Sequence, residues 1–515
     1  PNDVGPRLTD GDEFDFIVVG AGSAGATVAS RLSDNPNWKV LLLEAGGYPS
    51  AASEVPATFG SVSRTREDWN YDMEPSETSC LGMIGAKCPC PRGKALGGSS
   101  TINAMLYIRG NRENFDSWAR DGNTGWDFDS ILPYYKEDVQ GGDLKVTKYT
   151  SHHPMRETLI KAYQELGFGR YTQENPIGYF DSYTTIENGT RFSSAKAFLP
   201  KTKTRRNFYL ALDAQVSKVL VNEEMAVTGV EVRIGGKILK VNARKEVVLS
   251  AGSVNSPQIL MNSGIGPEDH LKKIGITLVR NLKVGHNLQD HIIFTGLFYN
   301  LAESALLPKS ADDVTDDWYQ YFRHRAGPIA QSGIPNFISF INPKRSSQQP
   351  AAEMFYVPIH KDDPYGTLRG LQETFGFPDE IVRAQTENNR KSHSVFLVPS
   401  LAHPKSAGRI LLRSSDPFDK PRIFANYLGD QHDEDLQTML EAIRFYQNLT
   451  ETRAFADTKP ELVHIPLPNC AQFAPNSDGY WRCALRNLAT TLYHLVGTCK
   501  MGPEGDSDAV VDPRL

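Results

Sequence analysis

Three closely spaced glycines near the start of the chain form a candidate phosphate-binding turn. They stand in Gly20-Ala-Gly22-Ser-Ala-Gly25, directly after the apolar run 14–19. In such a turn the first glycine permits the tight bend, the second lets the backbone approach a pyrophosphate, and the third lets the following helix lie close to the strand. The helix N-terminus then offers free N–H groups and the positive end of its dipole to the phosphates. This chemistry predicts a dinucleotide-binding site.

Glu44 is the candidate ligand for the ribose of that dinucleotide. It follows the next apolar run, 39–43, about 20 residues after the glycines, where dinucleotide-binding folds place an acid that accepts hydrogen bonds from ribose hydroxyls. A carboxylate here would repel a 2′-phosphate, so NADP is disfavoured. The alternative is a glycine turn in an unrelated α/β protein, and the ordered series of strand, glycines, helix, strand and acid argues against it.

These residues require a particular set of elements to position them. Runs 14–19 and 39–43 indicate parallel strands, and the small residues 26–32 between them indicate the crossover helix of a βαβ unit. Residues 246–252 indicate another buried parallel strand that ends in a glycine turn at Gly252. Ligands of open α/β sheets lie at the carboxyl ends of the strands, where these turns are. The sequence therefore predicts an α/β fold with a Rossmann-like domain.

A second glycine-rich loop has a different composition. Gly97-Gly98-Ser99-Ser100 places bare backbone beside hydroxyl groups, which suits the close approach of a flat ring or a phosphate. Taken alone, a plain glycine turn explains this segment as well.

Four segments, in this order along the chain, resemble signatures of the glucose–methanol–choline (GMC) family of flavoprotein oxidoreductases. Residues 93–103 are similar to the first family signature and residues 252–266 to the second. Residues 284–291 and 494–502 are similar to two later family segments, and details such as 106–111 are most similar to the insect branch. The resemblance covers nearly the whole chain.

This resemblance implies FAD, rather than NAD, as the bound dinucleotide. By similarity, the first glycine turn would face the pyrophosphate, the acid the adenosine ribose, the second loop the flavin and its ribityl chain, and a later strand the adenine. The residues so implied are Gly20, Gly22, Ser23 and Ala24 at the pyrophosphate, Glu44 at the ribose, Leu96, Gly97, Ser100, Asn103 and Ala104 along the flavin, Val216 at the adenine, and Trp69 and Gly252 beside the cofactor. For Trp69, an aromatic core residue is the alternative.

His494 is the candidate catalytic residue, and no metal ligand is predicted. Oxidation of an alcohol needs a base for the hydroxyl proton, for which histidine is suited, and an acceptor for the hydride, which oxidised flavin N5 provides. His494 matches the invariant base of the family, whereas a hydrogen-bonded core histidine is the alternative. His291 is expected only to brace a loop on the flavin side. The sequence thus favours FAD-dependent oxidation of an alcohol to an aldehyde or ketone, by an oxidase or a dehydrogenase.

Two departures from the family pattern keep other functions open. The family usually has a proline after the catalytic histidine, and here Leu495 follows it. Some relatives are hydroxynitrile lyases, in which the same histidine would take the hydroxyl proton of a cyanohydrin while FAD stays non-redox. Relatives also continue for several dozen residues beyond the position of Leu515, with a strand, flavin contacts and a second His or Asn. A missing C-terminal segment is therefore expected, and an inactive flavin- or partner-binding relative is a third possibility.

The chain is predicted to divide into two domains. Residues 13–300, with 480–515 returning to them, would form the FAD-binding domain, and residues 301–479 the substrate-binding domain. Alternating runs at 336–341 and 393–398 predict half-exposed strands of a mostly antiparallel sheet in an α+β domain. This sheet would roof the flavin and select the substrate, a small-molecule alcohol or cyanohydrin.

Composition excludes some classes of partner. Of the 515 residues, 40% are hydrophobic and 23% charged, which is typical of a soluble globular protein. The net charge of −6 gives no reason to expect nucleic acid as a partner. No apolar stretch approaches the roughly 18 residues of a membrane span.

The six cysteines indicate disulfides rather than a metal site. Cys80 is expected to pair with Cys88 or Cys90, and Cys470 with Cys483. The spacing of Cys88-Pro-Cys90 and the absence of a matching Cys/His cluster in the sequence make zinc a poor alternative.

Further features favour a secreted, glycosylated protein. Asn188-Gly-Thr190 and Asn448-Leu-Thr450 are N-glycosylation sequons. The sequence begins with Pro1-Asn-Asp and has no apolar signal region, so a presequence is expected to have been removed or trimmed.

Overall fold

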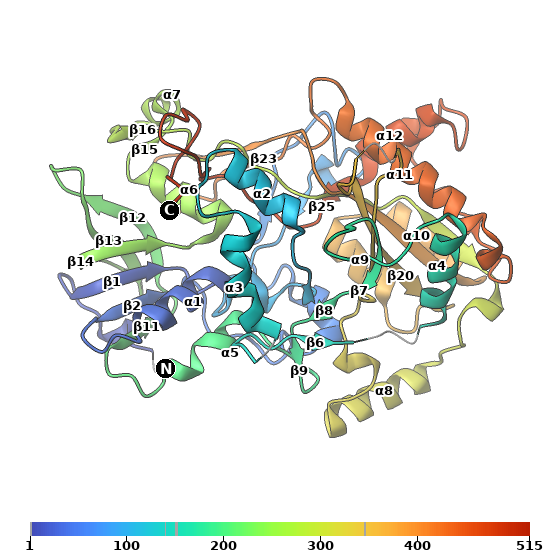
Figure 1. Cartoon of the computed structure of the whole chain (residues 1–515), viewed down its shortest axis with the longest axis horizontal. Helices are drawn as coiled ribbons and strands as arrows, with labels where there is room; N and C mark the ends of the chain where they lie inside the picture. The colour runs from blue at the N-terminus through green and yellow to red at the C-terminus, as the bar shows by residue number, and fades with distance from the viewer. Residues whose placement is uncertain (1–2, 140, 150–152, 345–346) are drawn as a thin grey trace.

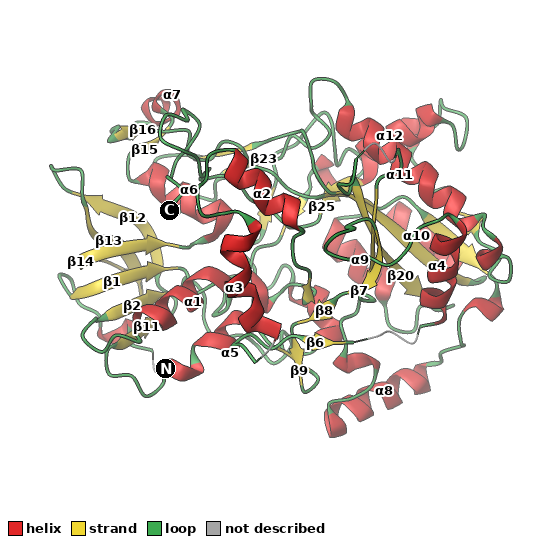
Figure 2. Cartoon of the chain, in the orientation of Figure 1, coloured by secondary structure: helices red, strands yellow, loops and turns green. Residues whose placement is uncertain are grey.

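The computed structural model describes residues 3–139, 141–149, 153–344 and 347–515. Figure 1 shows one β-sheet at each end of the elongated molecule, and Figure 2 shows the helices packed around and between the two sheets. Among the described residues, no helix has both the length and the apolar character that a membrane span requires. The α-helices are α1 (Ser23–Leu32), α2 (Arg112–Arg120), α3 (Phe128–Val139), α4 (Pro154–Glu165), α5 (Ser194–Phe198), α6 (Gly252–Asn262), α7 (Glu268–Lys273), α8 (Ala311–His324), α9 (Thr367–Phe375), α10 (Asp379–Asn389), α11 (Glu434–Thr450) and α12 (Asp478–Leu488).

The first sheet has six strands in the order β11-β2-β1-β14-β13-β12. β11, β2, β1 and β14 are mutually parallel, and β14, β13 and β12 form an antiparallel meander. The predicted βαβ unit is confirmed, because α1 connects two adjacent parallel strands of this sheet. The strands are β1 (Glu13–Val19), β2 (Val40–Leu43), β11 (Phe208–Ala211), β12 (Gln215–Val221), β13 (Val227–Ile234) and β14 (Lys237–Leu249).

The expectation for residues 246–252 is half right. Leu249 and its predecessors pair with β1 in parallel, as predicted. The prediction that this strand is buried is wrong, because residues 246–249 keep partly or fully exposed surface. The physical reason is that a cavity opens at this end of the strand, and Leu249, Ser250 and Gly252 line it.

The second sheet has eight strands and is antiparallel throughout, which confirms the prediction of a mostly antiparallel sheet. Six strands follow the order β24-β18-β21-β20-β19-β7, while β17 pairs with both β21 and β25. The strands are β7 (Gly178–Asp181), β17 (Ile292–Phe294), β18 (Phe298–Leu301), β19 (Phe337–Ile341), β20 (Ala352–Ile359), β21 (His393–Leu401), β24 (Glu461–Leu462) and β25 (Ala489–Thr491).

The prediction that these strands are half exposed is wrong. Every residue of β21 is buried, the polar residues His393, Ser394 and Ser400 included. Helices α10 and α11 pack against this strand, and the side chains of His393 and Ser394 are hydrogen-bonded inside the protein. His393 Nδ1 accepts a hydrogen bond from the Lys361 N–H at 2.9 Å, and Ser394 Oγ accepts one from the Asn389 amide at 3.2 Å. His393 and Ser394 therefore are buried, hydrogen-bonded polar residues and not part of a solvent face.

The antiparallel sheet also uses strands from outside residues 301–479. β7 and β17 come from before this range and β25 from after it, so the chain crosses between the two sheets several times. The division into residues 13–300 with 480–515, and residues 301–479, remains a prediction. Shorter strands form small sheets of two or three strands and are β3 (Tyr71–Asp72), β4 (Pro89–Cys90), β5 (Leu106–Tyr107), β6 (Thr147–Lys148), β8 (Tyr183–Thr184), β9 (Ile186–Glu187), β10 (Thr190–Arg191), β15 (Ile265–Gly266), β16 (Arg280–Asn281), β22 (Arg409–Leu411) and β23 (Arg422–Phe424).

Two disulfides connect neighbouring segments. Cys80 pairs with Cys88, which decides between the two partners left open by the sequence, and Cys470 pairs with Cys483 as predicted. Among the described residues, Cys90 and Cys499 are free thiols, and Cys90 is buried.

The disulfide pattern predicts a thiol count. After unfolding without a reductant, two of the six cysteines should react with a thiol reagent, and three should react in Cys80→Ser. The substitution should also lower the free energy of unfolding by about 2–4 kcal/mol, because the unfolded chain loses a cross-link. Cys499→Ser is the control, with one reactive thiol and little change in stability. Equal counts in wild type and Cys80→Ser would contradict the pairing.

Candidate active site

A cavity of about 440 Å³ opens at the carboxyl ends of β1, β2 and β14. The last residues of these strands, Val19, Leu43 and Leu249, contribute to its wall. The site residues predicted from the sequence that line this cavity are Gly20, Gly22, Ser23, Ala24, Glu44, Trp69, Val216 and Gly252. The cavity therefore brings together the first glycine turn, the acid, the adenine-side strand and the second family signature.

Two helices direct their N-termini into this cavity. Gly22 is the N-cap of α1 and Ala251 is the N-cap of α6. Neither helix has a side-chain hydrogen bond from its N-cap residue. The first residues of both helices, including Ser23 and Ser253, line the cavity. Uncapped backbone N–H groups and two positive dipole ends favour a diphosphate at this place.

Close backbone contacts explain why glycine is needed around the cavity. A Cβ on Gly25 would lie 1.8 Å from the Gly20 carbonyl oxygen, so α1 can lie on β1 only with glycine there. Gly98 has a φ of +55°, and a Cβ on it would lie 2.7 Å from the Cα of Gly22. The two glycine loops thus meet backbone to backbone and leave room for a group that side chains would otherwise fill.

Glu44 lies at the cavity wall with both carboxylate oxygens engaged. Oε2 accepts a hydrogen bond from the Ala21 N–H at 2.8 Å, and Oε1 accepts one from the Gly46 N–H at 2.9 Å. Burial raises the pKa of Glu44 to about 7, while these two hydrogen bonds oppose the shift. Each oxygen keeps a further lone pair, so the side chain can still accept ribose hydroxyls.

The second glycine loop reaches the cavity through Gly98 and Ser99, and the nearby Gly93 also lines it. The predicted residues that are not among the described residues lining the cavity are Leu96, Gly97, Ser100, Asn103 and Ala104. Several of these hold the loop in shape instead. The Gly97 N–H donates to the Ala21 carbonyl at 2.9 Å, and Ser100 Oγ donates to the Gly97 carbonyl at 2.6 Å. Their contact with a flavin remains a prediction.

Arg191 supports this loop and was not identified from the sequence. Its guanidinium is fully buried, and donates to the carbonyl of Ser100 at 3.2 Å and to Asn103 Oδ1 at 2.8 Å. Burial lowers the pKa of Arg191 to about 9. A basic residue at this position has no sequence signal of its own, because its role depends on a contact between segments that are far apart in the chain.

His494 lies just after β25 and is held by its backbone and by its ring. Its N–H donates to Asp290 Oδ1 at 2.8 Å, and its Nδ1 lies 3.0 Å from Nδ1 of His291. His494 is not among the described residues that line the cavity. Arg92 connects the two places, because it lines the cavity and donates from Nη1 to the Tyr493 carbonyl at 2.6 Å. His291 thus contacts the candidate base, beyond the bracing role expected from the sequence.

The surroundings of His494 keep its imidazole neutral. Part of its surface is exposed, but desolvation by the surrounding protein lowers the pKa of His494 to about 3, with further contributions from His291 and Arg92. At neutral pH the ring therefore has a lone pair available to accept a proton.

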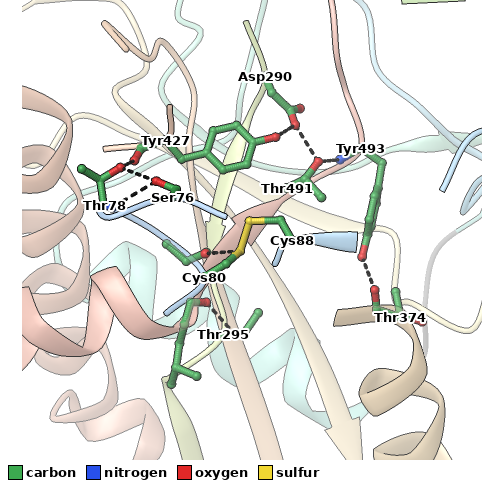
Figure 3. The surroundings of a disulfide bond; sticks show 12 residues. Ser76, Thr78, Cys80, Cys88, Asp290, Thr295, Thr374, Tyr427, Thr491 and Tyr493 are labelled. Atoms are coloured by element: carbon green, nitrogen blue, oxygen red, sulfur yellow. Dashed lines mark hydrogen bonds between the residues drawn. A yellow bond between two sulfur atoms is a disulfide. The ribbon is translucent and has the colours of Figure 1, made fainter. Parts of the chain in front are cut away.

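Asp290 is the centre of a buried hydrogen-bond network next to His494. Besides the His494 N–H, its carboxylate accepts hydrogen bonds from the hydroxyl groups of Thr491, at 2.5 Å, and Tyr427. Figure 3 shows both hydroxyl groups pointing at this carboxylate, close to the Cys80–Cys88 disulfide. Burial raises the pKa of Asp290 to about 6, and its hydrogen bonds oppose the shift.

The geometry can be compared with known proteins. The family models for GMC oxidoreductases match residues 14–293 and 404–515. The chain is 37% identical to glucose dehydrogenase [FAD, quinone] of Drosophila melanogaster, across 98% of this chain and 80% of that protein. It is 29% identical to ecdysone oxidase of Bombyx mori, across 98% of this chain and 77% of that protein. A crystal structure of formate oxidase superposes with a TM-score of 0.82 at 26% identity, across 99% of this chain and 92% of the other.

The chain belongs to the GMC oxidoreductase family. It is an FAD-dependent alcohol oxidoreductase, similar to the insect members of the family. The cavity fits this cofactor, because bare glycine backbone, two helix N-termini and a ribose-side carboxylate converge on it.

The glycine contact predicts a specific effect of a methyl group. Gly98→Ala should reduce the FAD content of the purified protein and lower its stability, because the new Cβ would clash with Gly22. Gly85→Ala is the matched control, since Gly85 also has a positive φ, of +67°, and no atom of the described chain lies within 4 Å of the place that its Cβ would take. In the control, an alanine in the left-handed region should lower the free energy of unfolding by only about 1–2 kcal/mol. FAD absorbance and melting temperature measure both effects, and equal effects would contradict the close-approach argument.

Glu44→Gln should weaken FAD binding and lower the free energy of unfolding by about 1–3 kcal/mol. The amide has one oxygen, so one of the two backbone N–H donors would face an N–H₂ group. Asp213→Asn is the control, because it removes the same charge near Glu44 from an exposed residue with a φ of +49°, where asparagine is tolerated. FAD titration and chemical unfolding measure the difference.

Because the pKa of Glu44 is raised, the difference in stability between wild type and Glu44→Gln should depend on pH. The folded, cofactor-free protein keeps the Glu44 proton up to a pKa of about 7, whereas the unfolded chain loses it near 4.5. This group's contribution to stability is therefore greatest at low pH and falls as pH rises through 7. The free energy of unfolding of Glu44→Gln should lack the part of the decline with pH that Glu44 causes. If the difference in this free energy between wild type and Glu44→Gln stays constant from pH 4.5 to 7, the raised pKa of Glu44 is contradicted.

Proposed function

We propose that the protein oxidises a small-molecule alcohol to an aldehyde or ketone, with His494 as the base and flavin N5 as the hydride acceptor. The observation that carries the proposal is the neutral His494, held at its backbone and its ring and linked through Arg92 to the dinucleotide cavity. The names of the relatives, which include a glucose dehydrogenase and an ecdysone oxidase, support an alcohol as the substrate.

Different residues of the chain bind the cofactor and transfer the proton. The two helix N-termini would hold the diphosphate of FAD, and Glu44 the adenosine ribose. When bound, FAD supplies the acceptor for the hydride that leaves the carbinol carbon. His494 takes the hydroxyl proton, so that the C–O bond becomes a carbonyl. Arg92 favours the neutral form of His494 before the reaction, because its guanidinium disfavours a second positive charge nearby.

Localisation outside the cell is part of the proposal. Both disulfides are of the kind that persists in oxidising compartments. Asn188 lies in the turn between β9 and β10 and Asn448 on α11, and both side chains are exposed, so both sequons are accessible to a glycan.

Anaerobic reduction of the flavin tests the catalytic assignment. An alcohol substrate should bleach the flavin absorption of the holoprotein, and His494→Ala should slow this by about 10²–10⁴-fold while FAD stays bound, because a positioned base contributes that much. His432→Ala, at an exposed histidine outside the site, is the control and should reduce at the wild-type rate.

Other outcomes would overturn the proposal. Flavin that stays oxidised with every alcohol, together with release of aldehyde and cyanide from a cyanohydrin, would establish a hydroxynitrile lyase. Flavin that stays oxidised without either reaction would establish an inactive flavin-binding relative. Bleaching at the wild-type rate in His494→Ala would show that another group is the base.

A further inference from the structure

The pairing of β17 with β25 places two consecutive residues against His494. Ile292 pairs with Thr491, and just beyond this pair the Leu492 N–H donates to the His291 carbonyl at 2.9 Å. The residues that precede β17 therefore lie opposite those that follow β25. Because of this register, Asp290 and His291 both reach the candidate base.

Asp290 fixes the backbone of His494. The side chain is 4% exposed, and its Oδ1 accepts from the His494 N–H at 2.8 Å. Oδ2 is held in turn by the hydroxyl groups of Thr491 and Tyr427. A carboxylate with three hydrogen-bond donors around it has a single favourable orientation, so the peptide unit that carries His494 is held firmly.

His291 faces the ring of His494 through one nitrogen. The Nδ1 atoms are 3.0 Å apart, a distance at which one nitrogen donates a proton and the other accepts it. The backbone of Ala402 acts to raise the pKa of His291 and so favours a proton on this ring, although desolvation lowers the pKa overall. Nδ1 of His291 faces His494, and the proposed arrangement puts the His291 proton on Nε2, so that Nδ1 of His291 accepts.

The tautomer of His494 follows from this arrangement. If His291 Nδ1 accepts, then His494 carries its proton on Nδ1 and donates it to His291. Nε2 of His494 keeps the lone pair and is the nitrogen that can take a proton from an alcohol. The opposite tautomer would leave a hydrogen on Nε2, and the ring could then donate there but not act as a base.

We infer that the Asp290-His291 dipeptide is a positioning element for the base, in which Asp290 fixes the backbone of His494 and His291 fixes its tautomer. The inference rests on the proposed function of His494. The hydroxyl proton moves to Nε2, and the charge of the resulting imidazolium is shared with His291 through the Nδ1–H hydrogen bond. Desolvation and the nearby His403 lower the pKa of His291, so that it stays neutral and able to accept.

Variants at position 291 separate this role from simple packing. His291→Asn keeps a side-chain oxygen near the position of Nδ1 and should accept the same hydrogen bond. His291→Leu fills similar space without an acceptor. His432→Leu, at an exposed histidine outside the site, is the control for the loss of a histidine.

The first measurement is the ¹⁵N spectrum of the imidazoles in the oxidised holoprotein, with the His494 signals assigned by their absence in His494→Ala. Wild type, His291→Asn and His432→Leu should show His494 protonated on Nδ1. His291→Leu should show the proton moved to Nε2 or distributed over both nitrogens. A His494 spectrum that His291→Leu leaves unchanged, or one with the proton on Nε2 in wild type, would overturn the inference.

The second measurement is the rate of flavin reduction by substrate as a function of pH. His291→Leu should lower the limiting rate at least about tenfold, and at most by the roughly 10⁴-fold that loss of the correct tautomer can cost, with a smaller change in the substrate concentration at half-maximal rate. His291→Asn should stay within about threefold of wild type. The pH profile of His291→Leu should change as well, because Arg92, Asp290 and His403 still face the site while the acceptor is lost.

Failure of the inference and failure of the proposed function give different results. If His494→Ala reduces its flavin at the wild-type rate, the proposed base is wrong, whatever the spectra show. If His494→Ala is slow but His291→Leu matches wild type in rate and spectrum, the base stands and the positioning role of His291 is wrong. If His291→Asn and His291→Leu are equally slow, the rate of flavin reduction does not depend on a hydrogen-bond acceptor at the position of His291 Nδ1.

Discussion

The antiparallel pairing of β17 with β25 is the constraint on which the candidate active site depends. It joins residues about 200 positions apart in the chain, since the bond from His494 to Asp290 spans 204 residues. Closing so long a loop has an entropic cost, and the buried ladder of Ile292, Ile293 and Phe294 against β25 offsets it. Because side chains alternate along strands, a register shift of one residue would turn His291 away from His494.

The cofactor cavity depends on a different constraint, which is the absence of side chains. Gly98 approaches Gly22 so closely that a methyl group on Gly98 would lie 2.7 Å from the Cα of Gly22. Two helix N-termini and the Glu44 carboxylate then supply directed polar contacts around this bare backbone. Arg92 joins the two constraints, because it lines the cavity and binds the peptide carbonyl next to His494.

The sequence predicted the local parts of this arrangement and missed those set by tertiary contacts. Gly20, Gly22 and Glu44 were identified because the βαβ unit is contiguous and its chemistry fixes their spacing. The family resemblance supplied FAD and His494. Burial of β21 was mispredicted, since Ser394 and His393 look exposed by polarity and are in fact bonded inside. The contacts of Arg191 and His291 could not be predicted, because both depend on which distant segments pair.

The use of a histidine rather than a carboxylate opposite the ring of His494 has a physical reason. A carboxylate about 3 Å from Nδ1 would raise the pKa of His494 and favour the imidazolium, which cannot accept a proton. A neutral imidazole offers an acceptor with the same direction and no charge, and the pKa of His494 stays at about 3. The carboxylate of Asp290 instead binds the His494 backbone N–H, where its charge strengthens the hydrogen bond without facing the ring. Orientation and availability of the lone pair are thus supplied by two adjacent residues with separate tasks.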